Sequence, residues 1–180
     1  MDVPLIELTD LLQRTPRILR SWLEGVPDAW TRATEGPGTW SPFDVVGHLI
    51  DGEETDWIPR LRIILEHGAG QPFEPFDRFR HKALNSARSM SELLDRFERL
   101  RKDSLEALAS RRVTEADYPR AGRHPELGPV TLGQLMATWA AHDLDHLAQI
   151  ARVMARRLAE DVGPWEAYLR IVRETPLTPA

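Results

Sequence analysis

Four long segments with helical spacing of apolar residues constrain the fold of this 180-residue chain most strongly. They cover about residues 4–24, 41–67, 89–111 and 131–159, and glycine and proline fall mainly between them. Apolar residues at every third or fourth position give each helix a face that must be buried. No segment shows the alternation of a strand. We therefore expect an all-α four-helix bundle forming a single domain, residues 1–180.

Residue types at the segment starts support two of these helix boundaries. Ser41 is placed to cap the second helix, with Pro42 at its first position and Asp44 in its first turn. Thr131 and Gln134 have the spacing of a capping box at the start of the fourth helix. The second and fourth helices are therefore expected to begin at these residues.

Prolines and the C-terminal segment add three further expectations. Pro16 and Pro59 lie inside the first and second segments, and each should bend or split its helix because proline lacks a backbone donor. The segment after Pro164 is expected to form a short extra C-terminal helix. Its apolar residues should dock it on the bundle: Trp165, Tyr168 and Leu169.

The composition excludes several kinds of chemistry. The chain has no cysteine, so it cannot form disulfides, cysteine-based zinc sites or iron–sulfur clusters, and any thiol must come from outside. The net charge is -5 and the arginines are interspersed with acids, so no broad phosphate-binding face is indicated. We expect no nucleic-acid partner.

The sequence also carries no sign of export or membrane insertion. The first residues, MDVPLIELTDLLQR, lack the positive charge and apolar core of a secretory signal. No apolar run approaches the roughly 18 residues of a membrane helix. We expect a cytoplasmic protein without membrane partners.

Two histidines on the fourth helix have the spacing of metal ligands. His142 and His146 are four positions apart, so their imidazoles lie on one face of the helix. A third ligand should come from a facing helix, and His48 is the best candidate because it lies between Val45 and Leu49 on an apolar stretch. The other histidines are expected to be ordinary surface residues: His67, His81 and His124.

Further polar residues share these inner faces. On the second helix they are Asp51 and Thr55, and on the fourth helix Asp145 and Gln149. Buried polar groups need partners, so these side chains are candidates to orient the imidazoles or to bind substrate. Asp51 and Asp145 are also candidates for proton transfer. Trp139 is expected either to line the cavity or to pack in the core.

The residues around the histidines resemble those of a known family. TWSPFDVVGHLIDGEETDW and TLGQLMATWAAHDLDHLAQI resemble the DinB/YfiT-like superfamily of metalloenzymes, and the resemblance covers nearly the whole chain. It implies an up-down-down-up four-helix bundle that holds a divalent ion, often nickel or zinc, through His48, His142 and His146. It also implies a homodimer and a transferase or isomerase activity that uses a low-molecular-weight thiol.

Several functions remain open on the sequence. Three neutral imidazoles would leave a bound ion an open position, where it could activate water for hydrolysis or hold a thiol as thiolate. The same site could instead bind a metal or small ligand without catalysis. A third alternative has no metal, with the histidines bonded to Asp51 and Asp145 in a buried polar network.

The connection between the second and third helices offers no motif for a substrate. It contains GAGQPFEPFDRFRHK, in which Asp77, Arg78 and Arg80 could meet an anionic substrate. A solvated loop is the favoured interpretation.

Overall fold

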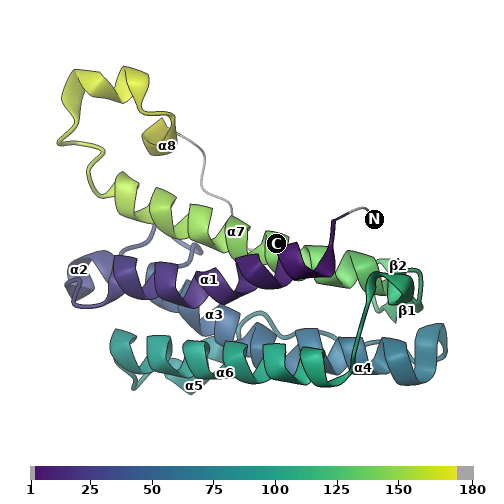
Figure 1. Ribbon diagram of the computed structural model, residues 1–180. Coiled ribbons are helices and arrows are strands. Elements are labelled where there is room, and N and C mark those ends of the chain that lie inside the picture. The colour runs from purple at the N-terminus through teal and green to yellow at the C-terminus, as the bar shows by residue number, and fades with distance from the viewer. Residues whose placement is uncertain (1–2, 174–180) are drawn as a thin grey trace.

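The computed structural model describes residues 3–173, and within them the chain is an all-α bundle as expected (Figure 1). Four helical columns form the bundle, the second of them interrupted: α1 (Leu5–Leu23), α3 (Pro42–Thr55) with α4 (Trp57–His67), α6 (Met90–Ser110), and α7 (Leu132–Arg156). Shorter elements connect or extend them: α2 (Asp28–Thr31), η1 (Gly68–Gly70), α5 (Arg80–Asn85), η2 (Glu115–Asp117), β1 (Ala121–His124), β2 (Gly128–Thr131), η3 (Gly163–Tyr168) and α8 (Arg170–Arg173).

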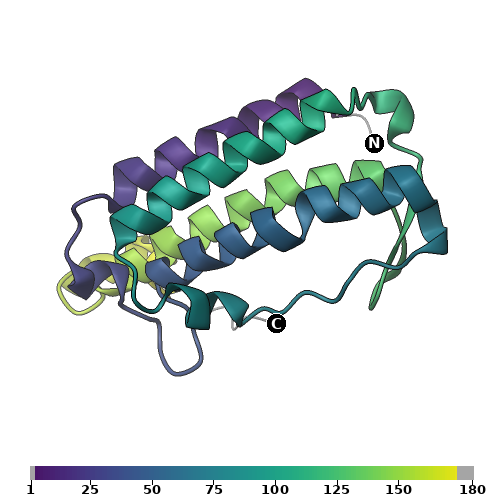
Figure 2. The same ribbon diagram turned by 90° about the horizontal axis from the view of Figure 1, so that it is seen from below.

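The helices follow the up-down-down-up order. Figures 1 and 2 show that α1 and α7 run in one direction, whereas α3–α4 and α6 run in the other. Because α3–α4 and α6 are consecutive and parallel, the chain must return to the starting end of the bundle between them. Residues 71–79 do this by running back along the bundle (Figure 2). We call this segment the crossover. It lies beside α3 and α4, where it can cover one side of the bundle.

The expected helix starts are confirmed. Ser41 accepts a hydrogen bond from the Asp44 backbone, and the Asp44 carboxylate accepts one from the Ser41 backbone. Thr131 and Gln134 form the same capping box at α7. These reciprocal bonds satisfy backbone donors that have no partner inside the helix. They fix where the two helices carrying the histidines begin.

The structure contradicts a split at Pro16 and places the break of the second helix before Pro59. Pro16 does not split α1, which is one continuous helix. Without a donor at Pro16 the Leu12 carbonyl is free, and it accepts a bond of 2.8 Å from Arg101 Nη1. The second column breaks at Asp56, so Pro59 lies in the first turn of α4, where its missing N–H costs no helical bond.

A short hairpin, β1–β2, lies between the third and fourth expected helices, although no strand was expected there. The strands are antiparallel, with Gly122 opposite Val130, and each has only four residues, too few to show an alternating pattern. The crossover is tied to it because the Phe73 N–H donates to the Arg123 carbonyl at 2.9 Å. The hairpin closes one end of the bundle.

The C-terminal segment is helical, but its expected docking residues are wrong. Trp165 is 70% exposed and Tyr168 is 86% exposed, while Val172 is buried. Figure 1 shows η3 turned away from the axis of α7, whereas α8 turns back and contacts α7. The chain leaves the axis of α7 before η3, with Gly163 at φ +52°, so these aromatic rings face outward. In residues 3–173, no helix combines the length and the apolar character needed to cross a membrane.

The core consists of two apolar clusters with charged groups between the helices. One cluster includes Leu12, Trp57 and Trp139, and the other includes Phe97 and Ile150. The charged groups centre on the fully buried guanidinium of Arg101 on α6. It binds the carboxylates of Glu53 on α3 and Asp143 on α7, with nitrogen–oxygen distances of 2.6–3.0 Å. The same guanidinium holds the Leu12 carbonyl of α1, so one side chain joins all four helices.

Replacing Arg101 with methionine should destabilise the protein strongly. The change leaves the carboxylates of Glu53 and Asp143 buried without a cation, a situation that typically costs about 3–5 kcal/mol. The measurement is the free energy of unfolding in urea. Arg99→Met removes an exposed arginine from the same helix and should change stability little. A loss in Arg101→Met no larger than in this control would contradict the assigned role.

Candidate metal centre

The three expected histidines converge on one point between α3 and α7. His48 Nε2 lies 3.0 Å from His142 Nε2, which lies 3.1 Å from His146 Nε2. All three can place a ring nitrogen within 4.8 Å of the others. The spacing of four residues on α7 produces this convergence, because His142 and His146 lie one turn apart on the face toward His48.

These distances fit a shared metal ion. Two imidazole nitrogens each about 2.1 Å from one ion are about 3.0 Å apart at a right angle and about 3.4 Å apart at a tetrahedral angle. The observed separations fall in or near this range. These separations also suit N–H···N hydrogen bonds, but His142 Nε2 can make such a bond with only one of its two neighbours, which leaves at least one pair without a proton or cation between the nitrogens. The donor set therefore suits a divalent ion.

The histidines are held in the neutral form that binds metals. Burial lowers the pKa of His48 to about 2 and that of His142 to about 3, and in both cases the neighbouring histidines add to the shift. Burial also lowers the pKa of His146. Neutral imidazole offers the lone pair that a metal requires, so the site needs no deprotonation at neutral pH.

Neighbouring side chains fix the ring orientations. His146 Nδ1 lies 2.8 Å from Gln149 Oε1, an arrangement in which Nδ1 carries the proton and Nε2 keeps its lone pair. The Trp57 ring packs edge-on against His142 with centroids 5.2 Å apart. Trp40 and Phe76 pack against His48 at 4.7 and 5.3 Å. The ligand set is thus supported on each of its three rings.

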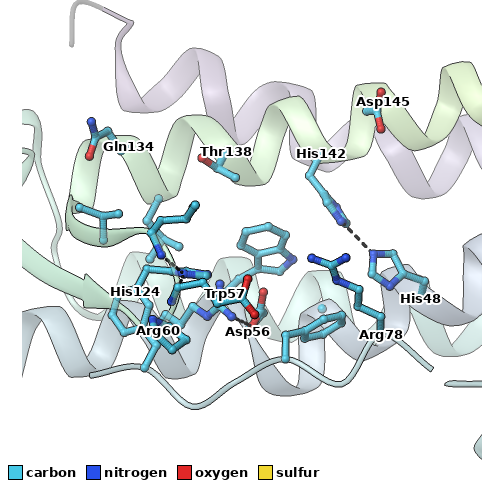
Figure 3. Close-up of a pocket in the computed structure, with 18 of the residues that line it drawn as sticks. His48, Asp56, Trp57, Arg60, Arg78, His124, Gln134, Thr138, His142 and Asp145 are labelled. Atoms are coloured by element: carbon cyan, nitrogen blue, oxygen red, sulfur yellow. Dashed lines mark hydrogen bonds and ion pairs between the residues drawn. The ribbon is translucent and has the colours of Figure 1, made fainter. Parts of the chain in front are cut away.

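A cavity of about 590 Å³ opens beside the histidines (Figure 3). Its walls come from α3, α4, α7, the crossover and the β1–β2 hairpin. Aromatic and aliphatic side chains line much of it: Trp40, Trp57, Phe73, Phe76, Leu127, Val130 and Leu135. Volumes of roughly 300–1,000 Å³ are typical of sites for small molecules. The histidines therefore lie at a cavity that can admit a substrate.

Two of the expected polar partners line this cavity and two do not. Gln149 lines it and holds His146, and Asp145 lines it while remaining exposed to solvent. Asp51 lies outside the lining and binds Arg80 at 2.7 Å. Thr55 is exposed and donates to the Asp51 carbonyl. The position of Asp51 therefore gives no support to its expected role in proton transfer.

Trp139 belongs to the core rather than to the cavity wall. Its indole N–H donates to Glu53 Oε1 at 3.1 Å, and its ring stacks on Trp57 with centroids 5.7 Å apart. Trp57, not Trp139, faces the cavity. Trp139 therefore links the charged group around Arg101 to the ring that packs against His142.

Two histidines expected at the surface are not surface residues. His81 is only 1% exposed, packs against Trp40 with centroids 4.9 Å apart, and has its pKa lowered by burial. His124 is half-buried, lines the cavity and accepts backbone bonds from Glu126 and Leu127. The basic residues beside His81 suggested an exposed position. The side of α5 that carries His81 nevertheless packs on α3. His67 is exposed, as expected.

Several charged residues of the site were missed in the sequence. Arg101 sits on a helix whose other face is rich in charge, and nothing in the local pattern marks it as buried. The burial of Asp143 could have been inferred from the sequence, because a carboxylate between two inward-facing histidines has little access to water. Asp56 and Arg60 line the cavity as a pair 2.6 Å apart, and burial raises the pKa of Asp56 to about 6. Their helix break at Asp56 has no strong sequence signature.

The fold and the three-histidine cluster define a helical bundle with a candidate metal centre. A family model for the DinB superfamily matches residues 11–150, and the chain belongs to this superfamily. The resemblance noted from the sequence is thereby confirmed.

Similar proteins agree with this assignment. A protein of Oceanobacillus iheyensis, named a putative metal-dependent hydrolase, is 26% identical over 152 residues, which cover 84% of each chain. Among solved structures, YfiT from Bacillus subtilis matches with a TM-score of 0.71 at 22% identity, over 85% of this chain and 87% of that one. It is described as a probable metal-dependent hydrolase with an unusual four-helix bundle topology. A DinB-like protein from Bacillus cereus matches with a TM-score of 0.57 at 17% identity, over 87% and 95% of the two chains.

Replacing Gln149 with alanine should weaken metal binding. His146 Nδ1 then loses its acceptor, and loss of such a partner typically lowers metal affinity about 10–100-fold. The measurement is zinc affinity in competition with a chromophoric chelator. Gln13→Ala, an exposed change on α1, serves as the control. Equal affinities in wild type and Gln149→Ala would show that Gln149 does not orient the ligand.

Proposed function

We propose that this protein is a metal-dependent hydrolase with one divalent ion bound by His48, His142 and His146. The observation that carries the proposal is the meeting of three neutral imidazoles at a cavity large enough for a small substrate. The name of the Oceanobacillus iheyensis relative supports the same activity. Imidazole ligands suit zinc and nickel, which are the ions we propose.

A divalent ion in this position supplies Lewis acidity and lowers the pKa of water toward neutrality. The chain supplies the remaining functions. Gln149 holds His146 in the tautomer that presents Nε2. Trp40, Trp57 and Phe76 pack against the ligand rings and limit the access of bulk water. Asp145 is the carboxylate at the solvent-exposed side of the cavity, and we propose that it passes the proton released in hydrolysis to solvent.

A low-molecular-weight thiol is a second candidate for the nucleophile. The chain has no cysteine of its own, so a thiol would have to enter the cavity from solvent. A volume of about 590 Å³ leaves room for a small thiol beside a second molecule, which favours considering transfer to a thiol as well as hydrolysis. The two reactions differ in their products: a free acid in hydrolysis and an acylated thiol in transfer.

The metal centre is tested by metal analysis and an esterase assay on the same protein. Wild type should contain about one zinc or nickel ion per chain, because three imidazoles form one site. Single changes to alanine at His48, His142 or His146 should each remove most of the ion. His67→Ala, an exposed histidine, is the matched control and should keep it. Hydrolysis of 4-nitrophenyl acetate should stop with chelator and return with zinc.

The outcomes separate the alternatives. If folded wild type binds neither zinc nor nickel, the remaining alternative is that the histidines form a buried polar network without a metal. Metal binding without turnover of esters, with or without added thiol, would favour a protein that binds the ion without catalysis. An acylated thiol that forms faster with the zinc-loaded protein than without enzyme, identified by mass spectrometry, would establish transfer.

A further inference from the structure

Arg78 is a cation without a partner at the metal centre. It belongs to the crossover and lines the cavity together with His48 and His142. Within residues 3–173 its guanidinium forms no hydrogen bond or ion pair. Its charge acts on His48 and contributes to the lowered pKa of that histidine. Figure 3 shows the side chain reaching from the crossover toward the histidines.

The other charges around the cavity do not neutralise this arginine. Asp56 is engaged by Arg60 at 2.6 Å. Glu126 and Asp145 line the cavity but are exposed to solvent. Asp77 precedes Arg78 and accepts a bond from the Phe79 backbone. Arg78 therefore keeps its positive charge available on the cavity side.

A divalent ion held by three neutral imidazoles keeps its full charge, and Arg78 adds another positive charge beside it. Arg78 is exposed to solvent, so water screens part of the repulsion between the two cations, and an anion bound between them would be attracted by both. This step rests on the proposed metal centre. An anionic ligand bound in the cavity would supply the negative charge that is missing beside the two cations.

The rest of the cavity is suited to an uncharged, apolar body. Away from the histidines its walls include Phe73, Leu127, Val130 and Leu135. Polar side chains also line it: Asp56 and Arg60, which pair with each other, and His124, Glu126, Gln134 and Thr138. The negative charge of Glu126 would repel a carboxylate from that end. A ligand with one acidic end and one apolar end would therefore have a single favourable orientation. The acid would face Arg78 and the histidines, and the apolar part would face the hairpin.

We propose that Arg78 binds the carboxylate of the substrate, and that the substrates are amphipathic carboxylic acids with a hydrolysable carbonyl a few bonds from the acid group. N-acyl amino acids have this chemistry. Arg78 thereby selects the substrate and places its carbonyl beside the metal centre. A guanidinium suits this task because it binds a carboxylate through two parallel hydrogen bonds.

The test compares 3-benzoylpropanoate with 3-benzoylpropanamide, which differ in charge. In both, a methylene replaces the amide nitrogen of an N-acyl amino acid, so the bond that the enzyme would cleave is absent. Binding is followed by calorimetry and by the fluorescence of Trp40 and Trp57, which line the cavity. Zinc-loaded wild type should prefer the carboxylate by about tenfold or more, as expected for a charge-assisted hydrogen bond. Chelator-treated wild type should keep a smaller preference, which gives a readout independent of activity.

Arg78→Gln should reduce the preference in the zinc-loaded protein and remove it in the chelator-treated protein, with binding of the amide unchanged, while Arg78→Lys should restore part of it. Arg62→Gln removes an exposed arginine of α4 that does not line the cavity, and it should behave as wild type. Equal binding of the two ligands by wild type, no binding of either at millimolar concentration, or a preference of the chelator-treated protein that survives Arg78→Gln would each overturn the proposal.

This result can be separated from the fate of the metal centre. Zinc bound at the histidines without a preference for the carboxylate would refute the role of Arg78 and leave hydrolysis standing. A preference that depends on Arg78 in a protein that binds no metal would refute the proposed hydrolase and keep the carboxylate site.

Discussion

The buried guanidinium of Arg101 is the interaction on which the site depends. From α6 it bonds to the Leu12 carbonyl of α1, to Glu53 of α3 and to Asp143 of α7. Glu53 lies five residues after His48, and Asp143 directly follows His142. A single side chain therefore sets the position of α3 against α7 along the bundle. The same relative position decides whether the three imidazoles meet.

Polar groups inside a helical bundle need partners, and the buried charges around Arg101 find them in one another. Arg101 is matched by two carboxylates, and Glu53 also accepts the indole N–H of Trp139. Trp139 stacks on Trp57, and Trp57 packs against His142. The rigid charged group and the open cavity are thus separated by two aromatic rings. This separation lets the cavity exchange water and ligand while the helix positions stay fixed.

The sequence predicted the features that depend on periodicity and local chemistry. The four helical columns, the capping boxes and the meeting of His48, His142 and His146 follow from spacing along single helices. The features that were missed depend on contacts between distant segments. His81 is buried because α5 packs on α3, and the helix tolerates Pro16 because Arg101 takes the freed carbonyl. The partnerless charge of Arg78 becomes visible only when the crossover is placed over the histidines.

The most direct test of the metal centre is X-ray absorption spectroscopy of the zinc-loaded protein, which reports ligand type and distance without an assay. The account predicts three imidazole nitrogens at about 2.0–2.1 Å and a remaining position filled by an oxygen ligand such as water. In the His142→Ala protein this imidazole signature should be lost. Zinc surrounded mainly by oxygen, with a spectrum unchanged by His142→Ala, would contradict the account, because the ion would then be bound elsewhere on the protein.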